Sequence, residues 1–142
     1  MQVDNILQSK GTEVYTVPTG APVAEAVRLL NERRIGAVVV TDPAGAVAGI
    51  LSERDIVRHL GGDPAQLLAS PVSNIMTKTV ITCGRDTSVS ELMEQMTRYR
   101  IRHIPIVEDG ALVGIVSIGD VVKRKIEETE QEALALREYI AS

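Results

Sequence analysis

The chain repeats itself, and this repetition limits its possible folds more than any other feature of the sequence. One set of residues matches across the two halves at a constant spacing, pairing Val14, Thr16, Val23, Glu25, Arg34 and Ile35 with Val80, Thr82, Val89, Glu91, Arg100 and Ile101. A second set matches at a spacing one residue shorter, pairing Gly45, Gly49, Ile50, Ser52, Asp55 and Val57 with Gly110, Gly114, Ile115, Ser117, Asp120 and Val122. The 142-residue chain is therefore interpreted as two copies of one small unit.

Each copy contains the same order of expected elements. Apolar residues recur at helical spacing over 23–30 and 89–96, which predicts one helix in each copy. Short β-branched runs follow, at 35–40 and 46–51 in the first copy and at 101–107 and 111–116 in the second. A second helix is expected to begin at Ser52 and at Ser117, since serine is a good N-cap. Related segments at 3–7 and 72–76 are expected to form short helices that lead into each copy.

A unit of this size cannot bury its sheet alone, so the two copies are expected to pack face to face about a pseudo-twofold axis. The predicted fold class is α+β, a pair of β-α-β-β-α repeats with small mixed sheets packed against each other and flanking helices. We expect repeat 1, with its leading helix and a linker, in 1–71, repeat 2 in 72–122, and a helical extension in 123–142. The linker, from Gly61 to Pro71, is interpreted as a plain connection.

Composition and charge exclude several classes of protein. Hydrophobic residues make up 44% and charged residues 24%, as in an ordinary globular protein. The net charge of −4 disfavours nucleic acid as a partner, and the absence of Phe and Trp leaves few platforms for stacking bases. No run approaches the roughly 20 apolar residues that span a bilayer, and no signal peptide is apparent. The expected protein is soluble and cytoplasmic, with no membrane partner.

The pattern Ser-x-x-Asp occurs once in each copy where a strand passes into a helix, at Ser52 to Asp55 and at Ser117 to Asp120. The structural interpretation is a capping box, in which the two side chains hydrogen-bond each other's backbone amides. The functional interpretation uses the same geometry: a helix start with free amides beside a carboxylate that can chelate a ribose diol. Duplication at matched positions favours the functional interpretation.

The run from Arg100 to Val107 is the second candidate for a binding site. Strand alternation separates Arg102 from His103, and Pro105 within the run suggests an edge strand that can line a cleft. Taken singly, Arg102 is interpreted as a solvated cation and His103 as a structural imidazole. Phosphate binding would use both.

Catalysis ranks last among the functional hypotheses. His59, His103 and Cys83 lack the spacing of a zinc motif, so no metal site is expected. The chain has no P-loop and no GxGxxG pattern, and no base is placed beside a nucleophile. We therefore expect neither catalytic residues nor a catalytic cofactor.

The order of these motifs resembles a tandem pair of CBS domains, the cystathionine-β-synthase-type modules that together form a stand-alone Bateman module. The runs IGAVVV and RIRHIPIV, each followed by a turn and then by GILSERD or GIVSIGD, carry the resemblance over Val3 to Val122. The resemblance implies a ligand with an adenosyl group. AMP is expected first, with ADP, ATP, NAD(H) or S-adenosylmethionine as alternatives.

The resemblance also implies two clefts, each lined by both repeats. The Asp120 cleft would take base contacts from Val14, Thr16, Ile35 and Gly36, ribose contacts from Asp120 and Ser117, and phosphate contacts from Arg102 and His103, with Pro105 in the same strand. The Asp55 cleft would be formed by Thr79, Val80, Thr82, Ile101, Ile50, Ser52, Arg54 and Asp55. Repeat 1 has Gly36 and Ala37 where repeat 2 has Arg102 and His103. We therefore expect the Asp120 cleft to prefer AMP-like ligands and the Asp55 cleft to bind more weakly or to accept a different ligand.

The stretch from Val121 to about Ile140 has no Gly or Pro and is predicted to form one long helix. Its apolar stripe consists of Val122, Ile126, Thr129, Ala133, Leu136 and Ile140. Such a stripe packs on another helix or on the protein's own core, and Thr129 and Ala133 argue against a long coiled coil. A homodimer contact and an effector-protein contact both remain open. The predicted function is a nucleotide sensor that signals occupancy by conformational change, and the alternative is a scaffold protein with empty, degenerate clefts.

Overall fold

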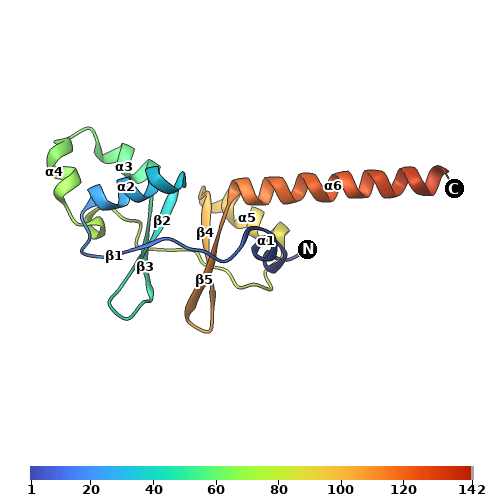
Figure 1. The fold of residues 1–142 in the computed structure, drawn as a ribbon, viewed down its shortest axis with the longest axis horizontal. Coiled ribbons are helices and arrows are strands. Elements are labelled where there is room, and N and C mark those ends of the chain that lie inside the picture. Colours follow the sequence, from blue (N-terminus) through green and yellow to red (C-terminus); the bar gives the residue numbers. More distant parts are fainter. Residues whose placement is uncertain (142) are drawn as a thin grey trace.

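The predicted α+β class is confirmed: two small sheets lie side by side with helices around them, and a long helix projects from one end (Figure 1). The computed structural model describes residues 1–141, so Ser142, the last residue of the expected extension, lies outside the described residues. The first part contains α1 (Val3–Lys10), β1 (Thr16–Pro18), α2 (Val23–Arg33), β2 (Ala37–Thr41), β3 (Val47–Ser52), α3 (Glu53–His59) and α4 (Pro64–Ala69). The second contains η1 (Val72–Asn74), α5 (Val89–Tyr99), β4 (His103–Glu108), β5 (Ala111–Ser117) and α6 (Ile118–Ala141).

The two sheets repeat each other down to a local irregularity. In the first sheet β1 runs parallel to β2, and β2 runs antiparallel to β3; in the second, β4 and β5 are antiparallel. The register shifts after Val40 in β2 and after the matching residue, Ile106, in β4. The strand that would match β1 is reduced to a parallel bridge between Cys83 and Ile106.

The first helices of the two repeats also match. Both α2 and α5 are 11 residues long, and both are followed by an arginine in the left-handed conformation, Arg34 with φ of 53° and Arg100 with φ of 55°. The buried faces are formed by Val23, Ala26 and Leu30 in α2 and by Val89, Leu92 and Met96 in α5. These residues have the helical spacing read from the sequence, so the prediction of both helices is confirmed.

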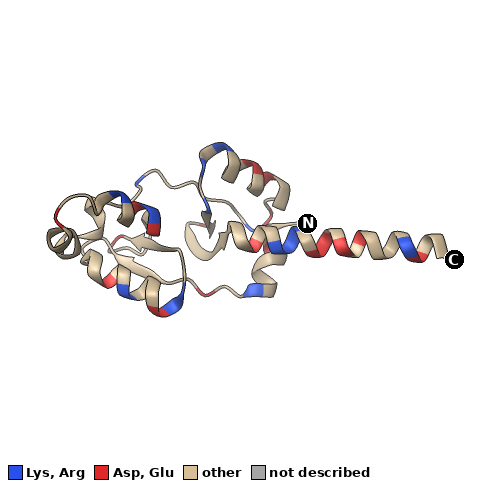
Figure 2. Ribbon diagram, turned by 90° about the horizontal axis from the view of Figure 1, so that it is seen from above, with Lys and Arg blue, Asp and Glu red and all other residues tan. Residues whose placement is uncertain are grey.

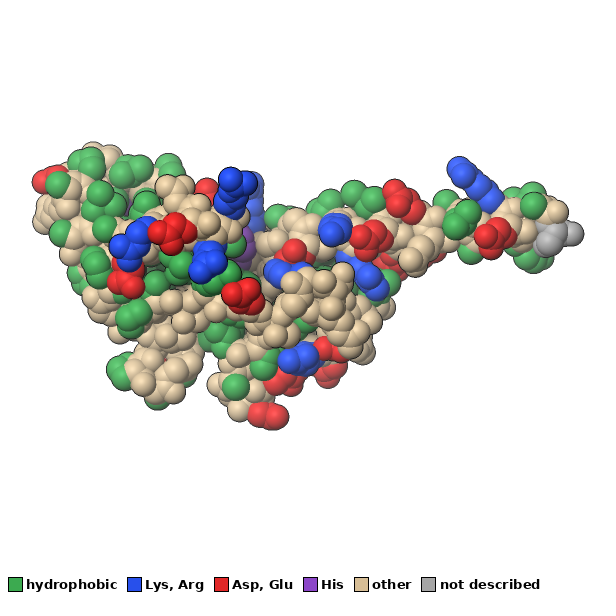
Figure 3. Space-filling model, viewed as in Figure 1, with side chains coloured by type: hydrophobic (Ala, Val, Ile, Leu, Met, Phe, Trp, Pro, Cys, Tyr) green, Lys and Arg blue, Asp and Glu red, His purple; other side chains and the backbone are tan. Residues whose placement is uncertain are grey.

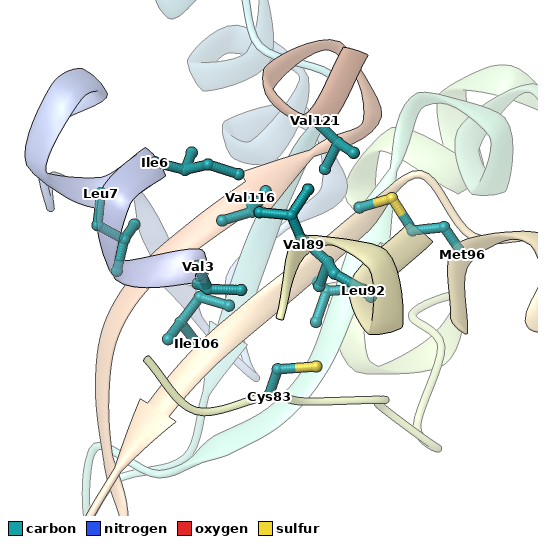
Figure 4. Packing of buried hydrophobic residues seen from close by; sticks show 11 residues of the cluster. Val3, Ile6, Leu7, Cys83, Val89, Leu92, Met96, Ile106, Val116 and Val121 are labelled. Atoms are coloured by element: carbon teal, nitrogen blue, oxygen red, sulfur yellow. The ribbon is translucent and has the colours of Figure 1, made fainter. Parts of the chain in front are cut away.

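The leading helix α1 packs on the second repeat, although it precedes the first repeat in the sequence. Val3, Ile6 and Leu7 belong to the core formed by α5, β4 and β5 (Figure 4). The backbone amide of Val3 donates a 2.8 Å hydrogen bond to the Thr87 carbonyl. The chain therefore crosses between the repeats before the first repeat begins.

The segment around η1 makes the reciprocal crossing. Val72 and Ile75 lie in the core of the first repeat, and the amide of Val72 donates to the Ala21 carbonyl at 2.8 Å. A pair of backbone hydrogen bonds then joins Thr77 to Ile50 in β3, at 2.9 and 3.0 Å. Each repeat is thus completed by a segment that leads into the other one.

The segment from Gly61 to Pro71 is more than the plain connection that we expected, because it contains α4. Asp63 caps this helix by accepting hydrogen bonds from the amides of Ala65 (3.1 Å) and Gln66 (3.4 Å), and Pro64 occupies the first turn. The helix also buries Leu67 in the first core. A cap, a proline and one apolar anchor therefore suffice for a short helix here.

The predicted C-terminal helix is confirmed as the single helix α6, which is 24 residues long. Its first turns pack on α5, α1 and β5 through Val121, and the rest projects away from the body (Figure 1). Among residues 1–141, no helix is both long and apolar enough to cross a membrane.

Candidate functional site

A cavity of about 480 Å³ opens around Asp55 where the two repeats meet. The first repeat contributes the end of β3 and most of α3, and the second contributes the segment 77–81 and the start of β4. Its lining residues are Gly36, Ile50, Ser52, Glu53, Arg54, Asp55, Val57, Arg58, Thr77, Thr79, Val80, Ile81, Arg100, Ile101, Arg102 and His103. Figure 3 shows cationic side chains gathered at the junction of the two halves.

The capping box at the start of α3 orients Asp55 in the cavity. Oδ2 of Asp55 accepts hydrogen bonds from the amide (2.9 Å) and the hydroxyl (3.1 Å) of Ser52, while the Asp55 amide donates to that hydroxyl at 3.3 Å. Oδ1 accepts no hydrogen bond from the described residues 1–141. The structural and functional interpretations of Ser-x-x-Asp are therefore compatible, because capping uses one carboxylate oxygen and leaves the other for a ligand.

Four arginines line the cavity: Arg54 and Arg58 on α3, and Arg100 and Arg102 before β4. Arg54 and Arg58 are four residues apart, so they lie one above the other on the same face of α3. The lining carboxylates are Glu53 and Asp55, so cations outnumber anions in the cavity. Guanidinium groups bind phosphate oxygens in a bidentate fashion, so this cavity is suited to a phosphorylated ligand.

Gly36 allows side chains of both repeats to meet at the wall of the cavity. A Cβ atom at this position would lie 2.9 Å from Oε1 of Glu53 and 3.1 Å from Cε1 of His103, which belongs to the other repeat. Burial lowers the pKa of His103 below its usual 6.5, although the charges of Asp120 and Glu53 act to raise it. The imidazole is therefore neutral at neutral pH and can accept as well as donate a hydrogen bond.

The Asp120 cleft differs because a lysine of α1 occupies it. Nζ of Lys10 donates to Oδ2 of Asp120 at 2.7 Å and to the Ile115 carbonyl at 2.8 Å, and the Ser117 amide donates to the same Oδ2 at 2.9 Å. Burial disfavours the charged form of Asp120, but the hydrogen bonds from Lys10 and Ser117 outweigh this effect and lower its pKa below 3.8. Asp120 is thus held ionised by the protein's own cation.

The pairing of segments 3–7 and 72–76 explains this asymmetry. When the alignment of these two segments is continued along the chain, Lys10 matches Thr79. Thr79 has a short, neutral side chain and lines the open cavity. The apolar residue before each of them does not differ in this way, since a Cβ at Gly114 would lie 2.7 Å from Cδ2 of Leu7 and a Cβ at the matching Gly49 would lie 2.5 Å from Sδ of Met76. The difference between the two leading segments is therefore Lys10, whose ammonium group hydrogen-bonds Asp120, against Thr79 beside the open cavity.

The predicted site residues fall into two groups in the structure. All of those expected in the Asp55 cleft except Thr82 line the cavity, namely Thr79, Val80, Ile101, Ile50, Ser52, Arg54 and Asp55. Of those expected in the Asp120 cleft, Gly36, Arg102 and His103 also line the Asp55 cavity, whereas Val14, Thr16, Ile35, Pro105, Ser117 and Asp120 do not. A ligand role for any of them stays a prediction.

Arg102 and His103 line the Asp55 cavity, although the sequence analysis expected them in the Asp120 cleft. The pseudo-twofold arrangement brings the start of β4 to the helix start of the other repeat, so both residues line the Asp55 cavity. The charge of Asp120 also acts on His103 and tends to raise its pKa, so the expected roles of these two residues at Asp120, and the ranking of the two clefts, stay predictions.

Six lining residues were missed from the sequence: Glu53, Val57, Arg58, Thr77, Ile81 and Arg100. Arg58 had a usable signal, since it follows Arg54 by one helical turn. Arg100 begins the candidate run from Arg100 to Val107 but was not assigned to either cleft. No three His, Cys, Asp or Glu side chains among the described residues cluster closely enough to hold a metal ion.

The contact between Lys10 and Asp120 predicts how stability depends on pH. A carboxylate whose pKa is lowered by folding stabilises the protein above its unfolded pKa, and this contribution is lost as the pH falls through the folded pKa. We expect Lys10→Met to be about 1 kcal/mol less stable than wild type at neutral pH. This difference should shrink as the pH falls below 3.8 and through the lowered pKa of folded Asp120, where the carboxylate becomes protonated. Urea unfolding of both proteins across this range measures it, and a constant difference would contradict the ion pair.

The comparison with known families identifies the repeats. The model of the CBS domain matches residues 8–62 and again residues 72–127. The chain therefore belongs to the CBS-domain family and contains two such domains in tandem. The resemblance read from the sequence is confirmed.

Solved structures of CBS-domain proteins superpose on most of the chain. A CBS-domain protein from Agrobacterium tumefaciens is 46% identical with a TM-score of 0.84, over 87% of this chain and 92% of the other. The CBS-domain pair of the protein MJ0100, in complex with 5′-methylthioadenosine and S-adenosyl-L-methionine, is 26% identical with a TM-score of 0.80, over 90% and 98%. A CBS-domain protein from Pyrobaculum aerophilum complexed with AMP is 29% identical with a TM-score of 0.75, over 84% and 89%.

Proposed function

We propose that this protein is a non-catalytic regulatory module that binds an adenine nucleotide in the Asp55 cavity. The observation that carries the proposal is the cavity itself, whose volume of about 480 Å³ falls in the range of small-molecule sites. Oδ1 of Asp55 is the acceptor for a ribose hydroxyl. The arginines supply donors for phosphate, and Ile50, Val80 and Ile101 supply apolar surface for a base.

AMP is the ligand that we place first. The relatives described above support an adenosine moiety, because AMP, 5′-methylthioadenosine and S-adenosyl-L-methionine all contain one. The surplus of arginines in this cavity favours a phosphorylated member of that class. ADP, ATP and NAD(H) are the next candidates, followed by S-adenosylmethionine, which carries no phosphate.

The Asp55 cleft replaces the Asp120 cleft as our candidate for the principal site. A ligand in the Asp120 cleft would have to displace Lys10 from two hydrogen bonds before it could reach the carboxylate. In the Asp55 cleft, the only partner of the carboxylate among the described residues is Ser52, which is part of the capping box. Nucleotide is therefore expected to bind there first.

The signal would be a change in how the two repeats pack. A ligand that contacts residues of both repeats stabilises the arrangement of the repeats in which all of those contacts can form. The size of the resulting shift between two arrangements is limited by the difference in the ligand's affinity for them. We expect α6 and the leading segments to transmit this change to an effector protein. The alternative function is a scaffold with empty clefts, which would be indifferent to nucleotide.

The test is a thermal-shift titration with AMP, ADP, ATP, NAD(H) and S-adenosylmethionine, run on protein shown to be free of co-purified nucleotide. The melting temperature should rise with ligand concentration, since a ligand that binds only the folded state stabilises it. Asp55→Ala should weaken binding by about tenfold, as expected for loss of a hydrogen bond to a charged group. Asp120→Ala is the matched control and should leave binding within about twofold. If no ligand raises the melting temperature, the scaffold alternative is favoured.

A further inference from the structure

The apolar stripe of α6 is largely exposed, and most of it lies beyond the body of the protein. Val122, Ile126, Leu136 and Ile140 are 47%, 54%, 59% and 74% exposed, and Thr129 and Ala133 between them are exposed as well. Val121, only 1% exposed, anchors the helix through a different face, because successive helical residues are rotated by about 100°. Green side chains along the projecting helix are visible in Figure 3. The stripe is about 27 Å long at 1.5 Å per residue.

The stripe has the spacing of a coiled-coil seam. Counted in heptads, positions a are Ile126, Ala133 and Ile140, and positions d are Val122, Thr129 and Leu136. Isoleucine at a with leucine at d favours two-stranded parallel coiled coils, and the C-terminal end of this seam has that pairing in Leu136 and Ile140. Thr129 and Ala133 weaken the middle of the seam. The seam is therefore suited to a short contact between two helices and not to a long coiled coil.

The charges beside the seam determine which partner and which orientation fit. Positions g carry Lys125, Glu132 and Tyr139, and positions e carry Lys123, Glu130 and Arg137 (Figure 2 shows the basic and acidic residues of α6). In a parallel pair, each g residue faces the e residue of the next heptad on the other helix. A second copy of α6 would therefore place Lys125 beside Glu130 and Glu132 beside Arg137, with opposite charges in both pairs and each pair present twice.

The antiparallel arrangement fails on charge. Its apolar layers would match, because Val122 would meet Ile140 and Ile126 would meet Leu136. The flanking positions would then bring Glu132 against its own copy and Glu130 against its own copy, which is repulsive. Within residues 1–141, neither of these glutamates nor Arg137 has an ion-pair partner, whereas Lys125 lies 3.8 Å from Glu128 on its own helix.

We propose that α6 is a dimerisation surface that pairs parallel and in register with α6 of a second copy of this chain. The seam is the stripe from Val122 to Ile140, and its orientation is set by Lys125, Glu130, Glu132 and Arg137. This proposal does not depend on the nucleotide site. It would place the two CBS pairs at the same end of the helical seam.

A disulfide trap tests both the seam and its direction. In a parallel pair Leu136→Cys faces its own copy across the seam, whereas in an antiparallel pair it lies opposite Ile126, about 15 Å from its copy along the helix. Under mild oxidation Leu136→Cys should form a covalent dimer in most of the protein. The control is Leu134→Cys, because Leu134 lies off the seam and is 56% exposed, nearly the same as Leu136 at 59%. This variant should stay monomeric on denaturing gels. The buried Cys83 is present in both proteins.

Charge reversal tests the partner by sedimentation over a range of concentrations. Glu132→Arg should weaken dimerisation by about tenfold, because two attractive pairs become repulsive. Adding Arg137→Glu should restore it, while Glu138→Arg, the same change off the seam, should have no effect. A monomer at every concentration would overturn the proposal and assign the stripe to a different partner protein. Equal cross-linking of the two cysteine variants, or a dimer in which Leu136→Cys does not cross-link, would also overturn it.

Discussion

Replacing Leu7 by alanine is expected to lower the free energy of unfolding by about 2 to 5 kcal/mol. Leu7 is 1% exposed and lies in the core of the second repeat, against the space that Gly114 leaves by having no side chain. Truncation would remove apolar contacts and leave a cavity between α1 and β5. The two backbones cannot easily close it, because the neighbouring residues Val3 and Ile6 hold α1 in place.

Urea unfolding of Leu7→Ala measures this effect. The matched control is Leu68→Ala in α4, where the leucine is 37% exposed and its loss should cost less than about 1 kcal/mol. Leu7→Ala should also loosen the end of α1 and with it the contact of Lys10 with Asp120. Equal losses in the two variants would mean that α1 does not dock on the second repeat in solution.

Lys10→Thr is expected to create a second nucleotide site. It gives the Asp120 cleft the residue type that Thr79 contributes to the open cavity. It also removes an ammonium group that makes two hydrogen bonds, at 2.7 and 2.8 Å, which a ligand would otherwise have to break. Each charge-assisted hydrogen bond contributes about 1.5 kcal/mol or more, and partial exposure reduces the sum, so affinity at Asp120 should rise by about thirtyfold.

Isothermal titration with the ligand found by thermal shift separates the outcomes. Wild type should bind one nucleotide per chain, and Lys10→Thr should bind two, the second lost on adding Asp120→Ala. Lys123→Thr, which removes the same charge from an exposed position on α6, should behave as wild type. If Lys10→Thr still binds one nucleotide per chain, Lys10 is not what closes the cleft.

Much of the fold could be predicted because the sequence pattern of each element in repeat 1 recurs at the matching position in repeat 2. The matched helices α2 and α5, the paired strands, and Ser52 as the cap of α3 all follow from residue type and spacing, and the duplication doubled the evidence for each. The helix α4 was missed because Gly61 and Gly62 were given more weight than the cap at Asp63 and the proline after it. Those two residues were the signal that a helix begins.

Long-range placement could not be predicted in the same way. The segments 3–7 and 72–76 are apolar in the same pattern, so nothing in their spacing tells which of two similar cores each one enters. Assigning Arg102 and His103 to a cleft required knowing which helix start faces the beginning of β4. Lys10 was missed because its partner, Asp120, lies at the other end of the chain, and an exposed lysine at a helix end has no distinguishing local pattern.

The exchange of leading segments has a consequence for the order in which the molecule forms. During synthesis α1 emerges before the rest of its core, whose other buried residues run from Cys83 to Val121. Its apolar face, with Val3, Ile6 and Leu7, therefore stays exposed until Val121 has been made. Neither repeat is complete when cut out alone, because each lacks the piece that the other half supplies. The two halves should consequently fold and unfold as one cooperative unit, and a fragment that ends between them should be prone to aggregate.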